Sequence, residues 1–381
     1  MPKTYFIVFI AVVMSVYAAM HGFLYWRLSS GLSLTASQRH WLKLALIVGA
    51  VSFIAGEFLS RLVPALPLLF FGSVWLGVVS ISLSMFLVEF FLSLAFPRQR
   101  RAFVLAALAL VFVVSAISLL NAALGPVLRQ VRVPLRGLDR DADGFTIVHL
   151  SDLHLGNLTS MRRLRRVVER VNALDPDLIC VTGDTLDGDV CRDEKYCAAL
   201  AGLRARHGVA AVTGNHEFYA GIDKFLELAR RSRWRVLRNQ SWIIEGRLAV
   251  VGLEEDTAAR FRLPGPDLET ALRDVPQGMP TVLLYHQPTH FAEAVRRGID
   301  LQLSGHTHAG QIPPMDLLVW LVYKYPSGLH RLGSSFIYTS PGTGTWGPPM
   351  RFLSRSQIVQ VVLAAGEAKN GGETNRMEEG T

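Results

Sequence analysis

The chain has few cysteines, no internal repeat and no nucleic-acid-binding motif. Its three cysteines, Cys180, Cys191 and Cys197, are too few for a disulfide scaffold, and their spacing is not that of a zinc site. These absences exclude a small disulfide-stapled domain, a repeat protein and a nucleic-acid-binding module. We therefore expect no nucleic-acid partner.

What the chain does contain indicates a membrane protein. Its 381 residues are more than one ordinary domain needs, so at least two parts are expected. Hydrophobic residues make up 50% of the chain and the mean hydropathy is +0.29. The long apolar runs all lie before about residue 125. A net charge of +8 suits anionic membranes as well as nucleic acids, and the missing nucleic-acid motif favours the membrane.

Four apolar segments are long enough to cross a bilayer as helices, which takes about 20 residues. They are residues 4–26, 41–62, 68–91 and 102–124. Ala18 and Ala19 would suit a signal-peptide cleavage site, but the apolar run continues to Trp26 and three more segments follow. We predict a multi-pass protein of the cell membrane with four transmembrane helices. The alternative is that one or two segments are re-entrant, and the oligomeric state is not determined.

Basic residues in the short loops predict the orientation of these helices. The loops after the first and third segments carry Arg27, Arg39, Lys43, Arg98, Arg100 and Arg101. The opposite side carries only two basic residues, Lys3 and Arg61. This places both termini outside the cytoplasm, although the run Arg129, Arg132, Arg136 and Arg140 opposes it. Outside the cytoplasm Cys191 and Cys197 could form a local disulfide, with two free thiols as the equal alternative.

Two carboxylates, Glu57 and Glu89, fall within the apolar segments. Intramembrane carboxylates are candidates for a functional role. The favoured interpretation here is that both lie near a membrane interface.

The remainder of the chain has the pattern of a layered α/β domain. Residues 127–144 are predicted to be a linker and lead strand, residues 145–365 the layered domain, and residues 366–381 a polar, disordered tail. Strands are predicted at 145–151, 178–182, 208–213, 240–245, 248–253, 281–285, 300–304, 335–340 and 357–363. Helices are predicted at 160–173, 192–204, 221–232, 266–273 and 289–297. This alternation fits a sheet sandwich flanked by helices.

Five short motifs in this half of the chain each follow a predicted strand. They are S-D-L-H-L-G (151–156), G-D-T-L-D (183–187), G-N-H-E (214–217), Y-H-Q-P (285–288) and G-H-T-H (305–308). Because strand ends in layered α/β folds share one edge of the sheet, the polar side chains should converge there. Imidazole, carboxylate and amide-oxygen ligands suit Mn, Fe, Zn or similar divalent ions. Two such ions about 3.5–4 Å apart can clamp a phosphoryl group, and Asp184 is the natural carboxylate to bridge them.

The motif set resembles the calcineurin-like metallophosphoesterase superfamily, and more narrowly its bacterial membrane-associated phosphodiesterase branch, which includes a lipid-A-pathway hydrolase. The narrower likeness rests on Ala309-Gly310-Gln311, 342–344 and 349–352. Ala309 and Ser356-Gln357 depart from the branch pattern. The resemblance implies a four-layer α/β/β/α sandwich, preceded here by the four transmembrane helices. It also implies two divalent metal ions, with Mn favoured over Fe, Zn or Mg.

By the same resemblance, each motif residue has an expected role. The first metal would be held by Asp152, His154, Asp184 and His308, and the second by Asp184, Asn215, His286 and His306. His216 would contact the phosphoryl oxygen or protonate the leaving group, and Asp187 would orient it by fixing the imidazole tautomer. Glu217 would support the same loop.

Other polar residues are interpreted as structural. His149, His290 and His330 lie outside the motifs and are treated as non-ligands, Asp177 as a turn residue, and Cys180 as a core residue. A cluster of arginines between 162 and 170 is either a solvated helix face or a surface attracted to anionic headgroups. The apolar run 313–325 is either buried core or a lipid-contacting wall, and lipid contact is favoured.

The sequence therefore predicts a membrane-anchored, metal-dependent phosphohydrolase that acts on a lipid-linked phosphodiester or pyrophosphate. One alternative keeps this chemistry but acts on soluble nucleotides or phosphodiesters. Another, of a different class, is a non-catalytic membrane receptor or scaffold, which the complete ligand set and His216 oppose.

Overall fold

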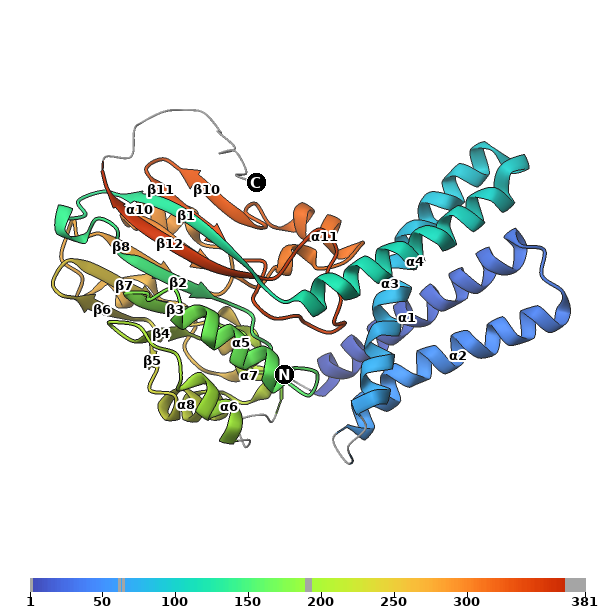
Figure 1. Cartoon of the computed structure of the whole chain (residues 1–381), viewed down its shortest axis with the longest axis horizontal. Coiled ribbons are helices and arrows are strands. Elements are labelled where there is room, and N and C mark those ends of the chain that lie inside the picture. The colour runs from blue at the N-terminus through green and yellow to red at the C-terminus, as the bar shows by residue number, and fades with distance from the viewer. Residues whose placement is uncertain (1–2, 61–62, 64–65, 189–193, 367–381) are drawn as a thin grey trace.

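A computed structural model describes residues 3–60, 63, 66–188 and 194–366 of the chain. Cys191 lies outside these residues, so its pairing with Cys197 stays a prediction. The predicted disordered tail also lies outside them, apart from its first residue. Two regions follow one another along the chain: a group of long helices and a sheet sandwich to one end of which they are joined (Figure 1).

Four long helices form the N-terminal region, and they occupy the four predicted apolar segments. They are α1 (Lys3–Gly31), α2 (Ala36–Leu59), α3 (Leu66–Ala95) and α4 (Arg100–Leu124). Among the described residues, three of them are long and apolar enough to cross a membrane, namely α2, α3 and the stretch containing α4. This corrects the predicted number from four to three. The side chains near the start of α1 are not among those described, so the span predicted there is not supported in the same way.

Small residues let the backbones of α2 and α3 approach closely. A Cβ atom added to Gly72 would lie 2.5 Å from the Cα of Phe53, and one added to Gly56 would lie 2.8 Å from the Cα of Leu69. Helices in lipid pack through such small residues because burying large apolar side chains against each other gains little over leaving them in lipid. Many large apolar side chains accordingly face outward, with Phe112 76% exposed.

Glu89 is paired inside the helical region, and its predicted place near a membrane interface stays a prediction. Its carboxylate is buried inside the helical region and accepts hydrogen bonds from Nε and Nη2 of Arg27 at 2.9 and 2.7 Å and from Oγ of Ser93 at 2.6 Å. Arg27 is also buried, and it provides the partner that a charged group in an apolar surrounding needs. Glu57, by contrast, is exposed close to the end of α2.

Two six-stranded mixed sheets form the sandwich. The first has the order β1-β12-β2-β3-β4-β5 and the second β10-β11-β9-β8-β7-β6. The strands of the first sheet are β1 (Val127–Leu135), β2 (Thr146–Leu150), β3 (Leu178–Thr182), β4 (Val209–Val212), β5 (Arg235–Val236) and β12 (Gln357–Ala365). Those of the second are β6 (Gln240–Ile244), β7 (Leu248–Gly252), β8 (Thr281–Leu284), β9 (Leu301–Ser304), β10 (Gly328–Leu332) and β11 (Ser335–Thr339).

Helices cover the outer face of each sheet and complete four layers (Figure 1). Apolar side chains of β2 and β3 pack outward against α5 (Met161–Asn172), α6 (Glu194–Leu200) and α8 (Ile222–Arg231). Those of β7 and β8 pack outward against α9 (Leu268–Leu272) and α10 (Phe291–Arg296). A third apolar cluster fills the space between the sheets. The predicted α/β/β/α fold is thus confirmed, while the predicted domain boundaries stay a prediction.

The predicted strands and helices of the sandwich are found within a few residues of their expected ends. Two strands and two α-helices among the described residues were not predicted: β5, β10, α7 (Asn215–Ala220) and α11 (Met315–Val322). The first three are at most six residues long and too short to have a clear hydrophobic period. The expected lead strand is β1, which pairs in parallel with β12 along its whole length.

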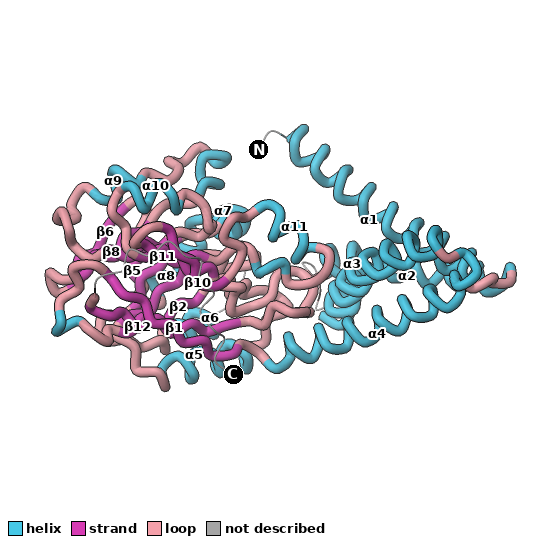
Figure 2. Tube along the Cα trace, turned by 90° about the horizontal axis from the view of Figure 1, so that it is seen from above, coloured by secondary structure: helices cyan, strands magenta, loops and turns pink. Residues whose placement is uncertain are grey.

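The two regions meet where α3 and α4 contact the loops after β9 and β11 (Figure 2). The backbone N–H of Arg351 donates to the carbonyl of Ser118 at 2.8 Å, and Nδ2 of Asn121 donates to the carbonyl of Arg351 at 3.2 Å. Met350 and Ile312 belong to the apolar cluster of the helices. Loops of the sandwich are therefore built into the helical region.

Candidate metal centre

The polar motif residues leave the sandwich at one edge, each directly after a strand. Asp152 and His154 follow β2, Asp184 follows β3, and the remaining motif residues follow β4, β8 and β9. Those remaining residues are Asn215, His216, His286, His306 and His308. Because β2, β3 and β4 are parallel, as are β7, β8 and β9, the loops after them emerge at shared sheet edges.

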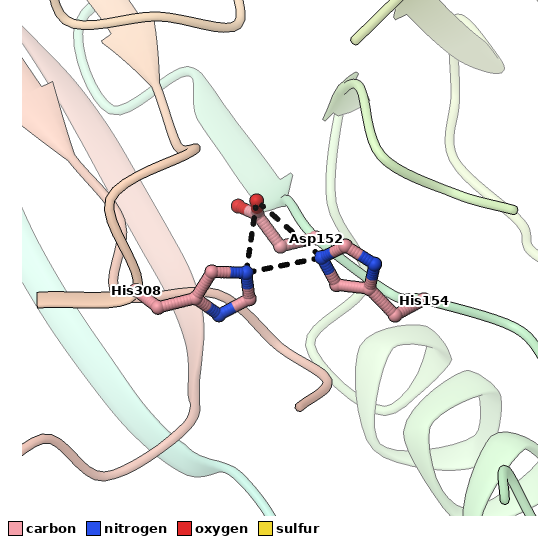
Figure 3. A group of neighbouring side chains, drawn as sticks. All are labelled: Asp152, His154 and His308. Atoms are coloured by element: carbon pink, nitrogen blue, oxygen red, sulfur yellow. Dashed lines mark hydrogen bonds and ion pairs between the residues drawn. The ribbon is translucent and has the colours of Figure 1, made fainter. Parts of the chain in front are cut away.

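The structure brings the predicted ligands together in overlapping groups. In each of three groups, the possible ligand atoms all lie within 4.8 Å of one another. The groups are Asp152, His154 and His308 (Figure 3), then His154, Asp184 and His216, and finally Asp184, His286 and His306. The amide oxygen of Asn215 lies 3.2 Å from Nε2 of His286 and completes the predicted set.

Asp184 belongs to two of the three groups, the one with His154 and His216 and the one with His286 and His306. Its Oδ2 is 3.2 Å from Nε2 of His286 and 3.8 Å from Nε2 of His154. On the other side, His308 points its Nε2 at Nε2 of His154, 3.0 Å away, and at Oδ1 of Asp152, 3.5 Å away. Asp184 thus lies where a carboxylate bridging two cations would have to lie.

Hydrogen bonds away from the centre orient two of the imidazoles. Nδ1 of His286 lies 2.8 Å from the carbonyl oxygen of Thr182, which can only accept. Nδ1 of His154 lies 2.9 Å from Oδ1 of Asp187. Both rings therefore carry their proton on Nδ1 and turn Nε2 toward the cluster, which is the arrangement of a metal-ligating histidine.

His216 is held by the same aspartate. Its Nδ1 lies 2.6 Å from Oδ1 of Asp187, while its side chain keeps 18% of its surface exposed. Burial alone would lower the pKa of His216, but the carboxylates of Asp184 and Asp187 outweigh it and raise the pKa to about 9. Asp187 was predicted to contact His216, and its second contact, with His154, was not predicted.

Glu217 ties two of the motif loops together. Its carboxylate is fully buried and accepts hydrogen bonds from the backbone N–H groups of Asp184, Thr185 and Gly214 at 2.9, 2.7 and 2.7 Å. Several N–H donors on one carboxylate fix the relative position of the loops that carry them. The predicted support by Glu217 therefore spans the Asp184 loop as well as its own.

The backbone at the centre is strained. Asp152, His154, Asp184, His306 and His308 all have positive φ angles, at 52°, 45°, 50°, 71° and 51°. Residues with side chains rarely adopt this conformation, which costs on the order of 1–3 kcal/mol at each position and concentrates at functional sites. Gly305 meets a different constraint, because a Cβ atom there would lie 1.8 Å from Oγ of Ser151.

The charges of the centre fit divalent cations. Asp152, Asp184 and His286 are buried together. Burial raises the pKa of Asp152, whereas at Asp184 the imidazoles of His286 and His216 outweigh burial and hold the pKa well below its usual range. Burial would lower the pKa of His286, but Asp184 raises it well above its usual value. Protons on imidazoles thus balance the carboxylates, and bound cations would replace those protons.

Arg351 is a residue of this centre to which the sequence analysis assigned no role. It is fully buried, and Nη2 lies 3.0 Å from Nδ1 of His308. Its other hydrogen bonds go to the carbonyls of Gly344 and Ser354, so it contacts no carboxylate directly. Its pKa falls to about 9, chiefly because of burial. The only sequence signal was its place in the 349–352 stretch.

The residues interpreted as structural lie apart from the three ligand groups. His149 is buried in β2 with Nε2 2.7 Å from Oγ1 of Thr182, and burial lowers its pKa to about 3. His290 lies near Asp256 and His330 near the carbonyl of Ser327. Asp177 accepts from the backbone and hydroxyl of Thr146, and Cys180 is fully buried in β3.

Two sheets that direct histidines, carboxylates and an amide to one edge define the class of this protein. A sandwich and a ligand set of this kind are those of the metal-dependent phosphoesterases.

Comparison with known proteins gives the family. The family model described as calcineurin-like phosphoesterase matches residues 145–310. A transmembrane protein with metallophosphoesterase domain from Danio rerio is 35% identical over 269 residues, covering 68% of this chain and 62% of that protein. An uncharacterized metallophosphoesterase from Aquifex aeolicus is 34% identical over 221 residues, covering 57% of this chain and 84% of that protein. The chain belongs to the calcineurin-like metallophosphoesterases, a family that uses divalent metals.

The match does not extend over the whole of the animal relatives. It spans 62% of the Danio rerio protein and 60% of a Bos taurus protein of the same name. Among solved structures, a dimetal phosphatase from Danio rerio aligns over 58% of this chain and 99% of its own, with 15% identity and a TM-score of 0.36. A likeness that distant adds nothing to the assignment.

Proposed function

We propose that the protein is a membrane-anchored two-metal phosphohydrolase that cleaves a phosphodiester or pyrophosphate bond in a lipid-linked substrate. The observation that carries the chemistry is the position of Asp184, whose carboxylate belongs to two of the three ligand groups. Asp152, His154 and His308 would complete the ligands of one cation. Asn215, His286 and His306 would complete those of the other, and Mn²⁺ is the favoured ion at both.

The residues of the chain have distinct tasks in this proposal. The bound cations supply an activated hydroxide and neutralise charge on the phosphoryl oxygens. Asp187 fixes Nδ1 of His216, so Nε2 points into the centre, 4.0 Å from Oδ2 of Asp184, where its proton would be available to the leaving-group oxygen. Glu217 keeps the loops of Asp184 and His216 at a fixed separation.

The lipid part of the proposal rests on α11. This helix directly follows the His306–His308 motif, and none of its residues is buried, which removes the alternative that it is core. Trp320, Leu321 and Val322 are 70%, 74% and 73% exposed. The carbonyl of Pro313, just before the helix, accepts a hydrogen bond from Oγ of Ser80 in α3 at 2.8 Å. An apolar helix between the metal centre and a membrane helix suits acyl chains.

The orientation is also a proposal. The loop-charge pattern favours a catalytic region outside the cytoplasm. The structure alters that pattern in one respect, because Arg27 is buried against Glu89 within the helical region and no longer counts as a loop charge. Arg98, Arg100 and Arg101 remain beside the α3–α4 turn. Protease protection of the C-terminal region in right-side-out and inverted vesicles decides between the two orientations.

The chemistry is tested with the purified full-length protein and Mn²⁺. We expect chelator-sensitive hydrolysis of an aryl phosphodiester, and we expect Asp184→Ala to lower kcat/KM by more than about 10³-fold and to reduce bound metal. Metal content is measured by elemental analysis. Full metal binding and undiminished hydrolysis in Asp184→Ala would contradict the two-metal centre. A folded wild-type protein that hydrolyses no phosphoester would instead support the receptor or scaffold alternative.

The lipid substrate is tested by making α11 polar. Leu317→Ser with Leu321→Ser should abolish most hydrolysis of lipid-linked phosphoesters and leave hydrolysis of the aryl phosphodiester within about 2-fold. Leu321→Met, which stays apolar, is the matched control and should retain both activities. Equal loss of both activities, or loss of neither, would contradict the lipid-linked substrate and favour the soluble-substrate alternative.

A further inference from the structure

A second feature of the molecule lies where helix α5 meets the ends of the membrane helices. A cavity of about 510 Å³ is lined on one side by Arg162, Arg163, Arg166 and Arg170 of α5. On the other side it is lined by apolar residues that include Phe70, Leu119 and Leu124. Its lining includes none of the predicted metal ligands, so it is separate from the proposed catalytic function.

The four arginines lie on one face of α5. They occupy positions i, i+1, i+4 and i+8 of the helix, whereas Arg165, also exposed on α5, does not line the cavity. Leu164, Val167, Val168 and Val171 are buried against the first sheet and hold the helix in place. The basic face is therefore fixed rather than freely placed in solvent.

Two of these arginines bind α5 to the end of α4. Nη1 of Arg163 donates to the carbonyl of Ala122 at 3.2 Å, and Nη1 of Arg170 donates to the carbonyl of Pro126. Ala122 lies in the last turn of α4 and Pro126 comes two residues after its end, so both bonds hold α5 at the C-terminal end of α4. Arg163 and Arg170 are thus used in joining the two regions.

The other two arginines have charges that the protein does not balance. Within the part of the chain that the structure describes, neither Arg162 nor Arg166 forms an ion pair with a carboxylate. Both are exposed, and both line the cavity. A cavity with two available guanidinium groups on one wall has the charge to bind a phosphate group.

The apolar wall determines which phosphate compound fits. Leu124 is the last residue of α4 and Phe70 lies in the first turns of α3, so both mark ends of helices that are apolar enough to cross a membrane. The arginines of α5 accordingly stand at the level of the lipid headgroups. Phe70 and Leu124, 49% and 62% exposed, give this wall an apolar surface that an acyl chain can cover and a soluble anion cannot.

We infer that this cavity binds an anionic phospholipid of the surrounding bilayer. Its headgroup phosphate lies against Arg162 and Arg166, and an acyl chain lies along Phe70, Leu119 and Leu124. The bound lipid joins α5 of the sandwich to α3 and α4 and is not the molecule that is hydrolysed.

The experiment uses full-length protein in uncharged detergent micelles and a fluorescent phosphatidylglycerol as the probe. A chelator is present, so that hydrolysis does not affect the signal. Each arginine near a membrane surface contributes roughly a 5-fold gain in affinity for anionic lipid, so Arg162→Gln with Arg166→Gln should weaken binding about 25-fold. Unlabelled phosphatidylglycerol should displace the probe, whereas phosphatidylcholine and inorganic phosphate at the same concentration should not.

Arg165→Gln is the matched control, because it removes the same charge from the same helix outside the cavity. It should change the affinity by less than about 2-fold. An equal loss of affinity in Arg165→Gln would mean that the effect comes from the general charge of α5, and it would overturn the inference. Unchanged binding in the double variant, or displacement by inorganic phosphate, would overturn it as well. The thermal unfolding of each variant is measured alongside, and Arg163 and Arg170 are left intact because they hold α5 on α4.

Discussion

The helical region and the sandwich of this protein differ in what they leave exposed and in what they bury beside their apolar side chains. In the sandwich, valine, leucine and isoleucine fill the space between the sheets, and the predicted metal ligands Asp152, Asp184 and His286 are buried at one edge. In the helices, many large apolar side chains face outward, and glycines, serines and the Arg27–Glu89 pair lie inside beside an apolar cluster that includes Ile81 and Phe86. The two regions therefore obey different rules within one chain.

The difference follows from the solvent that each region is built for. Water drives apolar side chains inward, at about 25 cal/mol per Å² of apolar surface buried. Lipid provides no such force between helices, so close backbone contact and buried polar pairs hold them together instead. Arg351 lies at the boundary, since its backbone bonds to α4 while its side chain reaches His308 of the metal centre.

The largest effect is expected when one buried charge of the helical region is left unpaired. Arg27→Leu removes the partner of Glu89 and should destabilise the protein by about 3–5 kcal/mol, the usual effect of breaking a buried ion pair. Denaturant unfolding in detergent measures it. Arg27→Leu with Glu89→Leu should restore most of the loss, because no unpaired charge remains. Full stability in the single variant would argue that the pair is not buried as described.

The boundary is tested at Arg351. Replacing it with glutamine removes the guanidinium from Nδ1 of His308 but keeps an amide that can still donate to the carbonyl of Gly344. Burial, His154 and the Arg351 guanidinium lower the pKa of His308, so without the guanidinium a proton should compete better with the cation, and we expect the affinity for one of the two ions to fall about 10-fold. Calorimetric titration with Mn²⁺ measures it, with Arg355→Gln in the same loop as the control. Wild-type Mn²⁺ affinity at both sites would mean that Arg351 has only a structural role.

The smallest expected effect tests whether α2 and α3 pack through small residues. Gly72→Ala places a Cβ atom against the backbone of Phe53 and should cost about 1–3 kcal/mol, because the backbone of α2 has to move. Gly22→Ala is the matched change, since no atom lies within 4 Å of its added Cβ. Thermal unfolding in detergent compares them. Equal stability of the two variants would mean that α2 and α3 are not packed through small residues.

Much of the fold and the candidate centre could be predicted from local patterns. The D-x-H and G-H-x-H motifs each directly follow an apolar strand, so their positions at one sheet edge were foreseeable from the strands alone. Glu217 and Asp187 were assigned correct neighbours, but their second contacts, with the Asp184 loop and with His154, join segments more than thirty residues apart. For the apolar run that contains α11 the sequence left buried core and lipid contact open and favoured lipid contact, and only the structure shows that none of the residues of α11 is buried.

The sequence by itself determined the family of this protein and the presence of helices long and apolar enough to cross a membrane. Ligand type and apolar length are properties of the side chains and of short stretches of chain, and they do not depend on what lies opposite. Only the tertiary structure decided that Glu89 pairs with Arg27, that Arg351 reaches His308, and that the arginines of α5 face the ends of α3 and α4. Each of these depends on which distant segments are packed together, and packing is decided by the whole chain at once.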